Sequence, residues 1–262
     1  MDEPHVLLTN DDGIDSVGFR ALYDALSEFA EVTAVAPNGD KSAVGRAMSR
    51  EVEVREHDLG YAIHGTPADC TVVGLEALCP DVDLVVAGCN RGANLGAYVL
   101  GRSGTVSAAV EAAFFDVPAI AVSLYVPGGD GEWQHAADHP DDYRNAAEAT
   151  TYLVDHALDA GVFEQAEYLN VNVPLWSEGD DLAPLEITEP STLYDMRAER
   201  SGERISLTDN VWARMRDGDL PDPQGTDRRA IVEGRVSISP LTAPHTTQHH
   251  EALDALAETY RD

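Results

Sequence analysis

Short apolar runs alternate along the chain with segments in which apolar residues recur every three or four positions. Such runs predict buried strands, and the longer spacing predicts helices with one buried face. The predicted strands cover residues 6–8, 32–37, 83–88, 118–124, 168–174 and 234–241, and residues 51–64 alternate roughly as further strands. The predicted helices cover residues 19–29, 67–78, 103–113, 143–160 and 247–260. This alternation predicts an α/β fold in which helices cover both faces of a mostly parallel sheet.

The pattern changes after residue 175. Residues 176–230 are charged and interrupted by Pro and Gly, and their alternating pieces, 186–188 and 204–207, are short. We interpret this segment as a hairpin-bearing arm rather than a second compact core. The predicted division is a core at 1–175 and a C-terminal extension at 176–262 that comprises the arm, the final strand and the terminal helix. An arm that packs poorly on its own indicates a role in a homodimer or homotetramer.

The chain is strongly acidic. It has 47 Asp and Glu against 17 Lys and Arg, a net charge of −30, and the acids are spread along the 262 residues. Because salt screens such self-repulsion, we expect a halophilic protein from a salt-rich cytoplasm. The lack of a basic patch argues against binding to a nucleic-acid duplex.

Further features concern the compartment. No apolar run approaches the roughly 18 residues that a membrane span needs, and the acidic N-terminus leads into a strand rather than a signal peptide. Cys70, Cys79 and Cys89 lack CxxC spacing and are odd in number, which is typical of reduced thiols. We therefore expect a cytoplasmic protein without membrane association.

Two adjacent acids, Asp11 and Asp12, follow the first predicted strand and precede the first predicted helix. In an open α/β sheet, ligands bind in the crevice beyond the carboxyl ends of the strands. Asp also favours turns and helix N-caps, so a purely structural role is the alternative. For a pair in this position we favour a site for a hard divalent cation, which prefers oxygen ligands.

Two later loops follow other predicted strands. The loop at 38–45 either adds Ser42 to the crevice or is a surface turn. The segment 88–96 contains three glycines together with Asn90 and Asn94, whose amide oxygens are neutral cation ligands. Its spacing matches neither GxGxxG nor a P-loop, so neither of these nucleotide-binding motifs is present.

A further candidate group lies at the start of the helix predicted near Ser103. Ser103, Gly104 and Thr105 combine hydroxyl groups with a helix N-terminus, which is an anion-binding arrangement. The alternative is an ordinary Ser or Thr cap. Next to a cation crevice, the phosphate interpretation is favoured.

With these segments in order, the chain resembles the SurE family of stationary-phase survival nucleotidases. The matching stretches are LLTNDDGI (7–14), VAPNGDKSAVG (35–45), GTPADC (65–70), GCNRGANLG (88–96), SGTVSAAVEA (103–112), PAIAVSL (118–124), LNVNVP (169–174) and EGRVSISPL (233–241). The resemblance implies a Rossmann-like core, a projecting C-terminal hairpin and helix used in dimers or tetramers, and phosphatase activity on nucleoside monophosphates. It also implies that one divalent metal ion is bound by Asp11, Asp12, Ser42 and Asn90.

Two positions depart from the family pattern: Ala43 stands where glycine is common, and Arg102 stands where tyrosine is common. Neither is an expected metal ligand, but both leave the preference for base and sugar open. The sequence also leaves open 5′ against 3′ phosphate, cleavage of polyphosphate, and Mg²⁺ against Mn²⁺.

We hypothesise that the chain is a metal-dependent phosphomonoesterase, a 5′-nucleotidase that converts nucleoside monophosphates to nucleoside and phosphate. Asp11, Asp12 and Asn90 would act through one Mg²⁺ or Mn²⁺, which polarises a phosphoryl group and lowers the pKa of bound water. The phosphate would be bound by Asn94, Ser103, Gly104 and Thr105.

The sequence leaves alternatives to the metal-dependent phosphomonoesterase open. An aspartyl-phosphate path through Asp11 or Asp12 would replace direct attack by water. A nucleotide-binding module would keep the site without turnover. A nucleoside hydrolase also has adjacent aspartates near an N-terminal strand, but it binds calcium and releases free base. The predicted helix start at Ser103 favours phosphate over the hydrolase.

Overall fold

The fold is built on a nine-stranded sheet with the order β3-β4-β2-β1-β5-β6-β7-β11-β8. The computed structural model describes residues 3–127, 136–246 and 251–259. The strands are β1 His5–Thr9, β2 Glu31–Pro37, β3 Glu53–His57, β4 Gly60–His64, β5 Leu84–Arg91, β6 Ala119–Tyr125, β7 Tyr168–Pro174, β8 Leu185–Ile187 and β11 Val236–Leu241. All neighbours from β4 to β7 run parallel, whereas β3 and β11 are antiparallel to β4 and β7. The carboxyl ends of β1, β2, β5 and β6 therefore meet at one edge.

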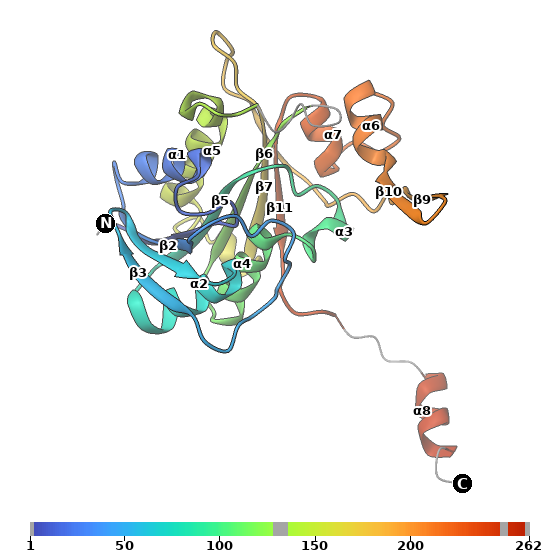
Figure 1. Ribbon diagram of the computed structural model, residues 1–262, viewed down its shortest axis with the longest axis horizontal. Coiled ribbons are helices and arrows are strands. Elements are labelled where there is room, and N and C mark those ends of the chain that lie inside the picture. Colours follow the sequence, from blue (N-terminus) through green and yellow to red (C-terminus); the bar gives the residue numbers. More distant parts are fainter. Residues whose placement is uncertain (1–2, 128–135, 247–250, 260–262) are drawn as a thin grey trace.

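Helices cover both faces of this sheet (Figure 1). One face carries α1 Val17–Leu26 and α5 Arg144–His156, and the other carries α2 Pro67–Val73 and α4 Gly104–Phe114. Strand β1 explains how the two cores separate, because its side chains alternate between faces. Leu8 packs in the cluster that includes α1 and α5, whereas Leu7 packs in the cluster that includes α2 and α4. The predicted α/β fold class is confirmed.

Several element boundaries differ from the predicted ones. The second helix ends at Val73 and a single π-type turn, Gly74–Leu78, replaces its last part. Strand β5 continues past Gly88 to Arg91, with a register shift against β6 between Ala87 and Asn90. The terminal helix α8 is Glu251–Thr259, and the rest of the predicted 247–260 helix lies outside the described residues.

The extension contains the predicted hairpin, formed by β9 Met196–Ser201 and β10 Arg204–Asp209. It also contains two helices that the sequence pattern did not predict, α6 Asn210–Asp217 and α7 Asp227–Val232. Figure 1 shows α6 and α7 side by side next to the hairpin, and α8 set apart from them. Strands β8 and β11 join the main sheet, so the extension is tied to the core by backbone pairing.

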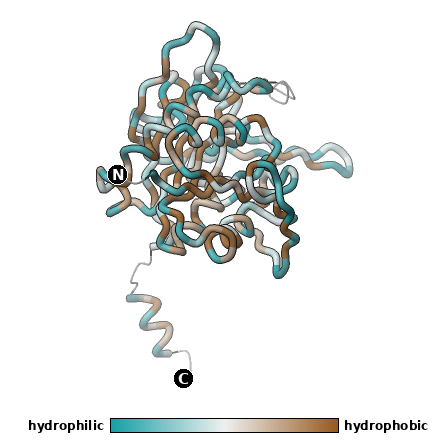
Figure 2. Tube along the Cα trace, turned by 90° about the vertical axis from the view of Figure 1, so that its left-hand side faces the viewer, coloured by the Kyte–Doolittle hydropathy of each residue, from teal (hydrophilic) through white to brown (hydrophobic). Residues whose placement is uncertain are grey.

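The surface carries most of the charge. Along the tube of Figure 2, hydrophobic segments gather in the body of the fold. The buried acids among the described residues are Asp11, Asp69, Glu111, Asp222 and Asp227. No helix in the described part of the chain has both the length and the hydrophobicity to cross a membrane.

Because the net charge of −30 lies mainly at the surface, we expect salt to stabilise the fold. The Debye length falls from about 10 Å at 0.1 M to about 3 Å at 1 M salt, which screens repulsion between neighbouring acids. The midpoint of thermal unfolding, followed by circular dichroism, should rise steadily with KCl over this range. A midpoint that stays constant or falls would contradict this account of the surface.

Candidate metal and phosphate site

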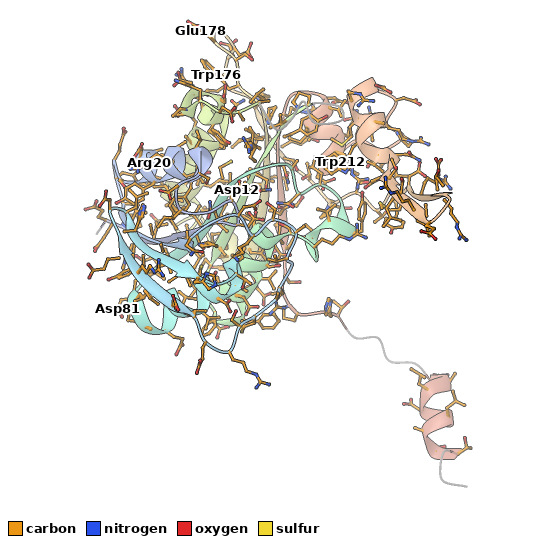
Figure 3. The ribbon with its side chains drawn as sticks, viewed as in Figure 1. Asp12, Arg20, Asp81, Trp176, Glu178 and Trp212 are labelled. Atoms are coloured by element: carbon orange, nitrogen blue, oxygen red, sulfur yellow. The ribbon has the colours of Figure 1, made fainter. Side chains whose placement is uncertain are left out.

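The turn after β1 holds the two adjacent aspartates at the carboxyl edge of the sheet. Nδ2 of Asn10 donates to the Gly13 carbonyl oxygen at 2.8 Å and to Ser16 Oγ at 2.9 Å, and the Gly13 amide donates back to Asn10 Oδ1 at 3.1 Å. The N-cap of α1 is Ser16. The alternative that an aspartate of the pair caps this helix is therefore wrong. Figure 3 shows Asp12 near the centre of the molecule, close to β5.

Asp11 is buried against the first turn of α4. Its Oδ1 accepts a hydrogen bond from Thr105 Oγ1 at 2.6 Å. A Cβ atom at Gly104 would lie 2.8 Å from Asp11 Cβ, so only glycine allows the helix to come this close. Burial, followed by the charge of Asp12, raises the pKa of Asp11 to about 7, although hydrogen bonds from Thr105 lower it.

Asp12 is held by the end of β5. Its Oδ2 accepts a hydrogen bond from the Arg91 amide at 2.8 Å. Burial is the main cause that raises the pKa of Asp12, and the charge of Asp40 adds to it. Asn90, the residue before this amide, donates from Nδ2 to the Gly92 carbonyl at 2.5 Å. This contact fixes the amide plane and leaves Oδ1, the atom that a cation prefers, on the other side of the group.

The loop after β2 is drawn toward the same place. The Lys41 amide donates to the Asp11 carbonyl oxygen at 2.7 Å, which positions the next residue, Ser42. Ser42 Oγ donates its proton to Asp40 Oδ1 at 2.6 Å, so the lone pairs of Oγ remain for a cation. The Gly45 amide donates to the Arg102 carbonyl oxygen at 3.2 Å, which connects this loop to the start of α4.

The predicted phosphate-binding residues divide into two groups. Ser103 is the N-cap of α4, and its Oγ accepts from the Val106 amide at 3.0 Å, while Gly104 and Thr105 form the first turn next to Asp11. Asn94 belongs to a buried network, in which its Nδ2 donates to Ser123 Oγ at 2.8 Å. Its amide donates to Asn172 Oδ1 at 2.8 Å.

Sequence reasoning missed two contributors. Asp40 orients Ser42, and the backbone amide of Arg91 holds Asp12. The role of Asp40 could have been found in the sequence, because an Asp two residues before a Ser commonly accepts a hydrogen bond from the Ser amide, as Asp40 does here at 2.7 Å. The Arg91 amide is a main-chain group, so the pattern of side chains along the sequence does not reveal its role.

The family model of the survival protein SurE matches residues 6–196. The chain belongs to the SurE family. It is 67% identical over 261 residues to the 5′-nucleotidase SurE of Haloarcula marismortui, covering 99% of this chain and 96% of that protein. It is 39% identical to the 5′-nucleotidase SurE of Pelobacter propionicus, covering 90% of this chain and 92% of the relative.

A solved structure of the same family supports the fold. The crystal structure of the SurE protein from Aquifex aeolicus matches with a TM-score of 0.78 and 28% sequence identity. The match covers 99% of this chain and 100% of that chain. The SurE fold therefore extends through the C-terminal extension, beyond the residues that the family model matches.

The donor set at this edge of the sheet fits a hard divalent cation. Asp11 is buried and its neighbour Asp12 is partly buried, and desolvation is the main cause that raises the pKa of both carboxyl groups. The described residues contain no group of three or more His, Cys, Asp and Glu arranged for a metal, so neutral oxygens must complete such a site. Ser42 and Asn90 present such oxygens, and oxygen-only sets suit Mg²⁺ and Mn²⁺.

Gly104→Ala tests the close approach of α4 to the aspartate pair. The added Cβ would lie 2.9 Å from Asp11 Oδ2, and we expect it to displace this carboxylate and weaken Mn²⁺ binding. Overpacking of this kind costs about 1–3 kcal/mol of stability. Gly101→Ala is the matched control, because within the described residues nothing lies within 4 Å of its Cβ position. Equal Mn²⁺ affinity in both variants, measured by electron paramagnetic resonance, would contradict this role for Gly104.

Proposed function

We propose that this SurE-family protein is a metal-dependent 5′-nucleotidase that hydrolyses nucleoside monophosphates to nucleoside and phosphate. The observation that carries the proposal is the adjacent pair Asp11 and Asp12, of which Asp11 is buried against the N-terminal turn of an eleven-residue helix and Asp12 is partly buried beside the end of β5. A cation at the pair and the positive end of the helix dipole would attract a phosphate from two sides. The name 5′-nucleotidase SurE, borne by relatives at 56–67% identity over nearly the full chain, supports the same activity.

The chain's own residues have separate parts in this proposal. Asp11, Asp12, Ser42 and Asn90 hold the cation, which when bound polarises the phosphoryl group. The first turn of α4 orients the phosphate, and Ser103 and Gly104 stand at the N-terminal end of this helix. Thr105 contributes by holding Asp11 in place, since its hydroxyl is already donated to that carboxylate. Positioning and charge stabilisation then supply most of the catalysis, as expected for phosphoryl transfer.

The contacts of Asn94 favour a different role from the phosphate binding that the sequence predicted. Its side chain donates to Ser123 and its carbonyl accepts from Asn170 Nδ2 at 2.9 Å, so it braces the loop that carries Asn90. We infer that it supports the phosphate site through this loop.

The homodimer or homotetramer expected from the extension also stays a proposal, and light scattering in high salt is its direct test.

Asp11→Asn should reduce phosphate release to the level that remains in EDTA, because one of the two carboxylates that hold the cation becomes a neutral amide. Asp15→Asn is the matched control: Asp15 lies in the same loop, is largely exposed, and contacts His57 at 3.3 Å. We expect Asp15→Asn to keep the wild-type rate. Near-normal turnover of Asp11→Asn at saturating Mn²⁺ would overturn the assignment of this ligand.

Removal of the metal separates the candidate functions. With Mn²⁺ or Mg²⁺ in high salt, AMP should yield adenosine and phosphate, and EDTA should abolish the release until metal is returned. A panel of 5′ and 3′ monophosphates would then rank the substrates. Folded protein that binds nucleotide without turnover would support a binding module instead. Release of free base without phosphate would support a nucleoside hydrolase.

A further inference from the structure

The glycine-rich loop and the C-terminal extension share a small hydrophobic core. Leu95, from the loop that follows Asn90, is fully buried in a cluster with Val211, Met215, Leu220 and Ile231, all of which belong to the extension. The extension therefore packs within its own chain on a segment of the candidate site. This packing is independent of any role that the projecting hairpin has in assembly.

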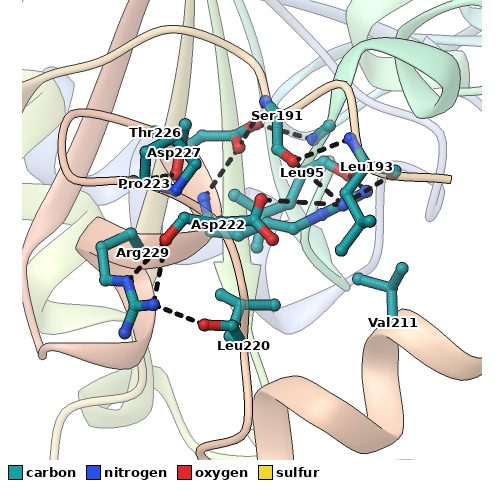
Figure 4. Close-up of polar contacts among 12 residues, drawn as sticks. Leu95, Ser191, Leu193, Val211, Leu220, Asp222, Pro223, Thr226, Asp227 and Arg229 are labelled. Atoms are coloured by element: carbon teal, nitrogen blue, oxygen red, sulfur yellow. Dashed lines mark hydrogen bonds and ion pairs between the residues drawn. The ribbon is translucent and has the colours of Figure 1, made fainter.

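Polar groups of the extension also form hydrogen bonds with the main chain of the same stretch of loop (Figure 4). Asp227 Oδ2 accepts the Gly96 amide at 2.6 Å, and the Ser191 carbonyl accepts the Ala97 amide at 2.8 Å. Arg228 donates from one terminal nitrogen to the Leu95 carbonyl at 3.2 Å. Three consecutive loop residues are thus bonded to the extension.

The clamp formed by Ser191, Asp227 and Arg228 is itself braced. Asp227 Oδ1 accepts the Ser191 amide at 2.9 Å, and the other terminal nitrogen of Arg228 donates to Ser191 Oγ at 3.2 Å. The side chain of Arg228 is fully buried, with the buried carboxylate of Asp222 at 3.9 Å. Buried charges of both signs with several hydrogen bonds fix one geometry, since breaking a single partner leaves the others uncompensated.

Gly96 shows how closely the arginine approaches the loop. A Cβ atom at Gly96 would lie 2.1 Å from a terminal nitrogen of Arg228, and the φ angle of Gly96 is +91°. Only glycine combines this φ with the space that the guanidinium occupies. The glycine at this position is therefore explained by the clamp, rather than by the approach of a ligand.

The clamped stretch joins the two halves of the candidate site. Upstream lies Asn90, whose amide plane is fixed by the Gly92 carbonyl. Downstream, α3 Ala97–Leu100 leads to Ser103, whose amide donates to the Val99 carbonyl at 3.2 Å. A shift of residues 95–97 would move the cation ligand and the helix start relative to each other. Catalysis is sensitive to displacements of this size.

We propose that Asp227 and Arg228 are positioning residues for the metal and phosphate site, acting through the loop at 95–97. The C-terminal extension is then part of the catalytic unit of each subunit. This inference rests on the proposed function, because the effect of the clamp is exerted on a metal-binding loop. Groups that orient metal ligands without touching the metal change its affinity about 10–100-fold when they are removed.

The experiment measures Mn²⁺ affinity by electron paramagnetic resonance, without substrate, and phosphate release from AMP as a function of Mn²⁺. Arg228→Met removes the guanidinium and keeps much of the side-chain volume. We expect its Mn²⁺ dissociation constant and its Mn²⁺ activation constant to rise about 10-fold or more, with part of the activity restored by excess Mn²⁺. Asp227→Asn, which keeps the shape and loses the charge, should change both constants in the same direction by less.

Arg229→Met is the matched control. Arg229 is the next residue of the same helix, but it donates to the carbonyl of Asp222, at 2.9 Å, and to that of Leu220, both within the extension. It should lower the unfolding midpoint yet leave Mn²⁺ affinity within about twofold. A metal affinity that falls equally in Arg229→Met would show a merely structural role.

The remaining outcomes also test the proposal. Folded Arg228→Met with wild-type affinity and activation would overturn the proposal, and if that variant fails to fold, unchanged constants in Asp227→Asn would do so. Wild-type protein that neither binds Mn²⁺ nor releases phosphate would instead defeat the proposed function, so the two failures are distinguishable.

Discussion

The desolvation of two adjacent carboxylates at the end of β1, buried Asp11 and partly buried Asp12, is the constraint on which the site depends. Desolvation and the charge of Asp12 raise the pKa of Asp11 to about 7, and desolvation and the charge of Asp40 raise the pKa of Asp12. Hydrogen bonds from Thr105 and from the Arg91 amide offset part of this cost. A divalent cation would offset much more, because opposite charge favours the ionised form. The pair is therefore unfavourable as pure architecture and well suited to binding a cation.

The surrounding structure brings three chain segments to that pair. The β2 loop is anchored on the Asp11 carbonyl, β5 supplies the amide for Asp12, and α4 approaches through Gly104. Further out, the extension buries Leu95 and bonds the main chain of the glycine-rich loop. The extension contributes strands β8 and β11 to the main sheet as well. A projecting hairpin and a brace for the site are thus parts of one extension.

The sequence predicted the sheet, and it placed Asp11, Ser42 and Asn90 at or after the carboxyl ends of its strands, because parallel strands put these ends at one edge. It did not determine side-chain direction: the hydroxyl of Thr105 bonds Asp11, and Asn94 is turned into a buried network. Helices α6 and α7 escaped prediction because they have eight and six residues, too few for a clear period. Their apolar contacts, moreover, include Leu95, which is distant in the sequence.

A crystal structure with Mn²⁺ and AMP, analysed by anomalous diffraction, tests the central claim most directly. The account predicts one strong Mn²⁺ peak per chain within coordination distance of Asp11, Asp12 and Asn90, with the AMP phosphate between this peak and the first turn of α4. A peak bound elsewhere, or an aspartate pair that stays metal-free at saturating Mn²⁺, would contradict the claim that the adjacent carboxylates form a cation site.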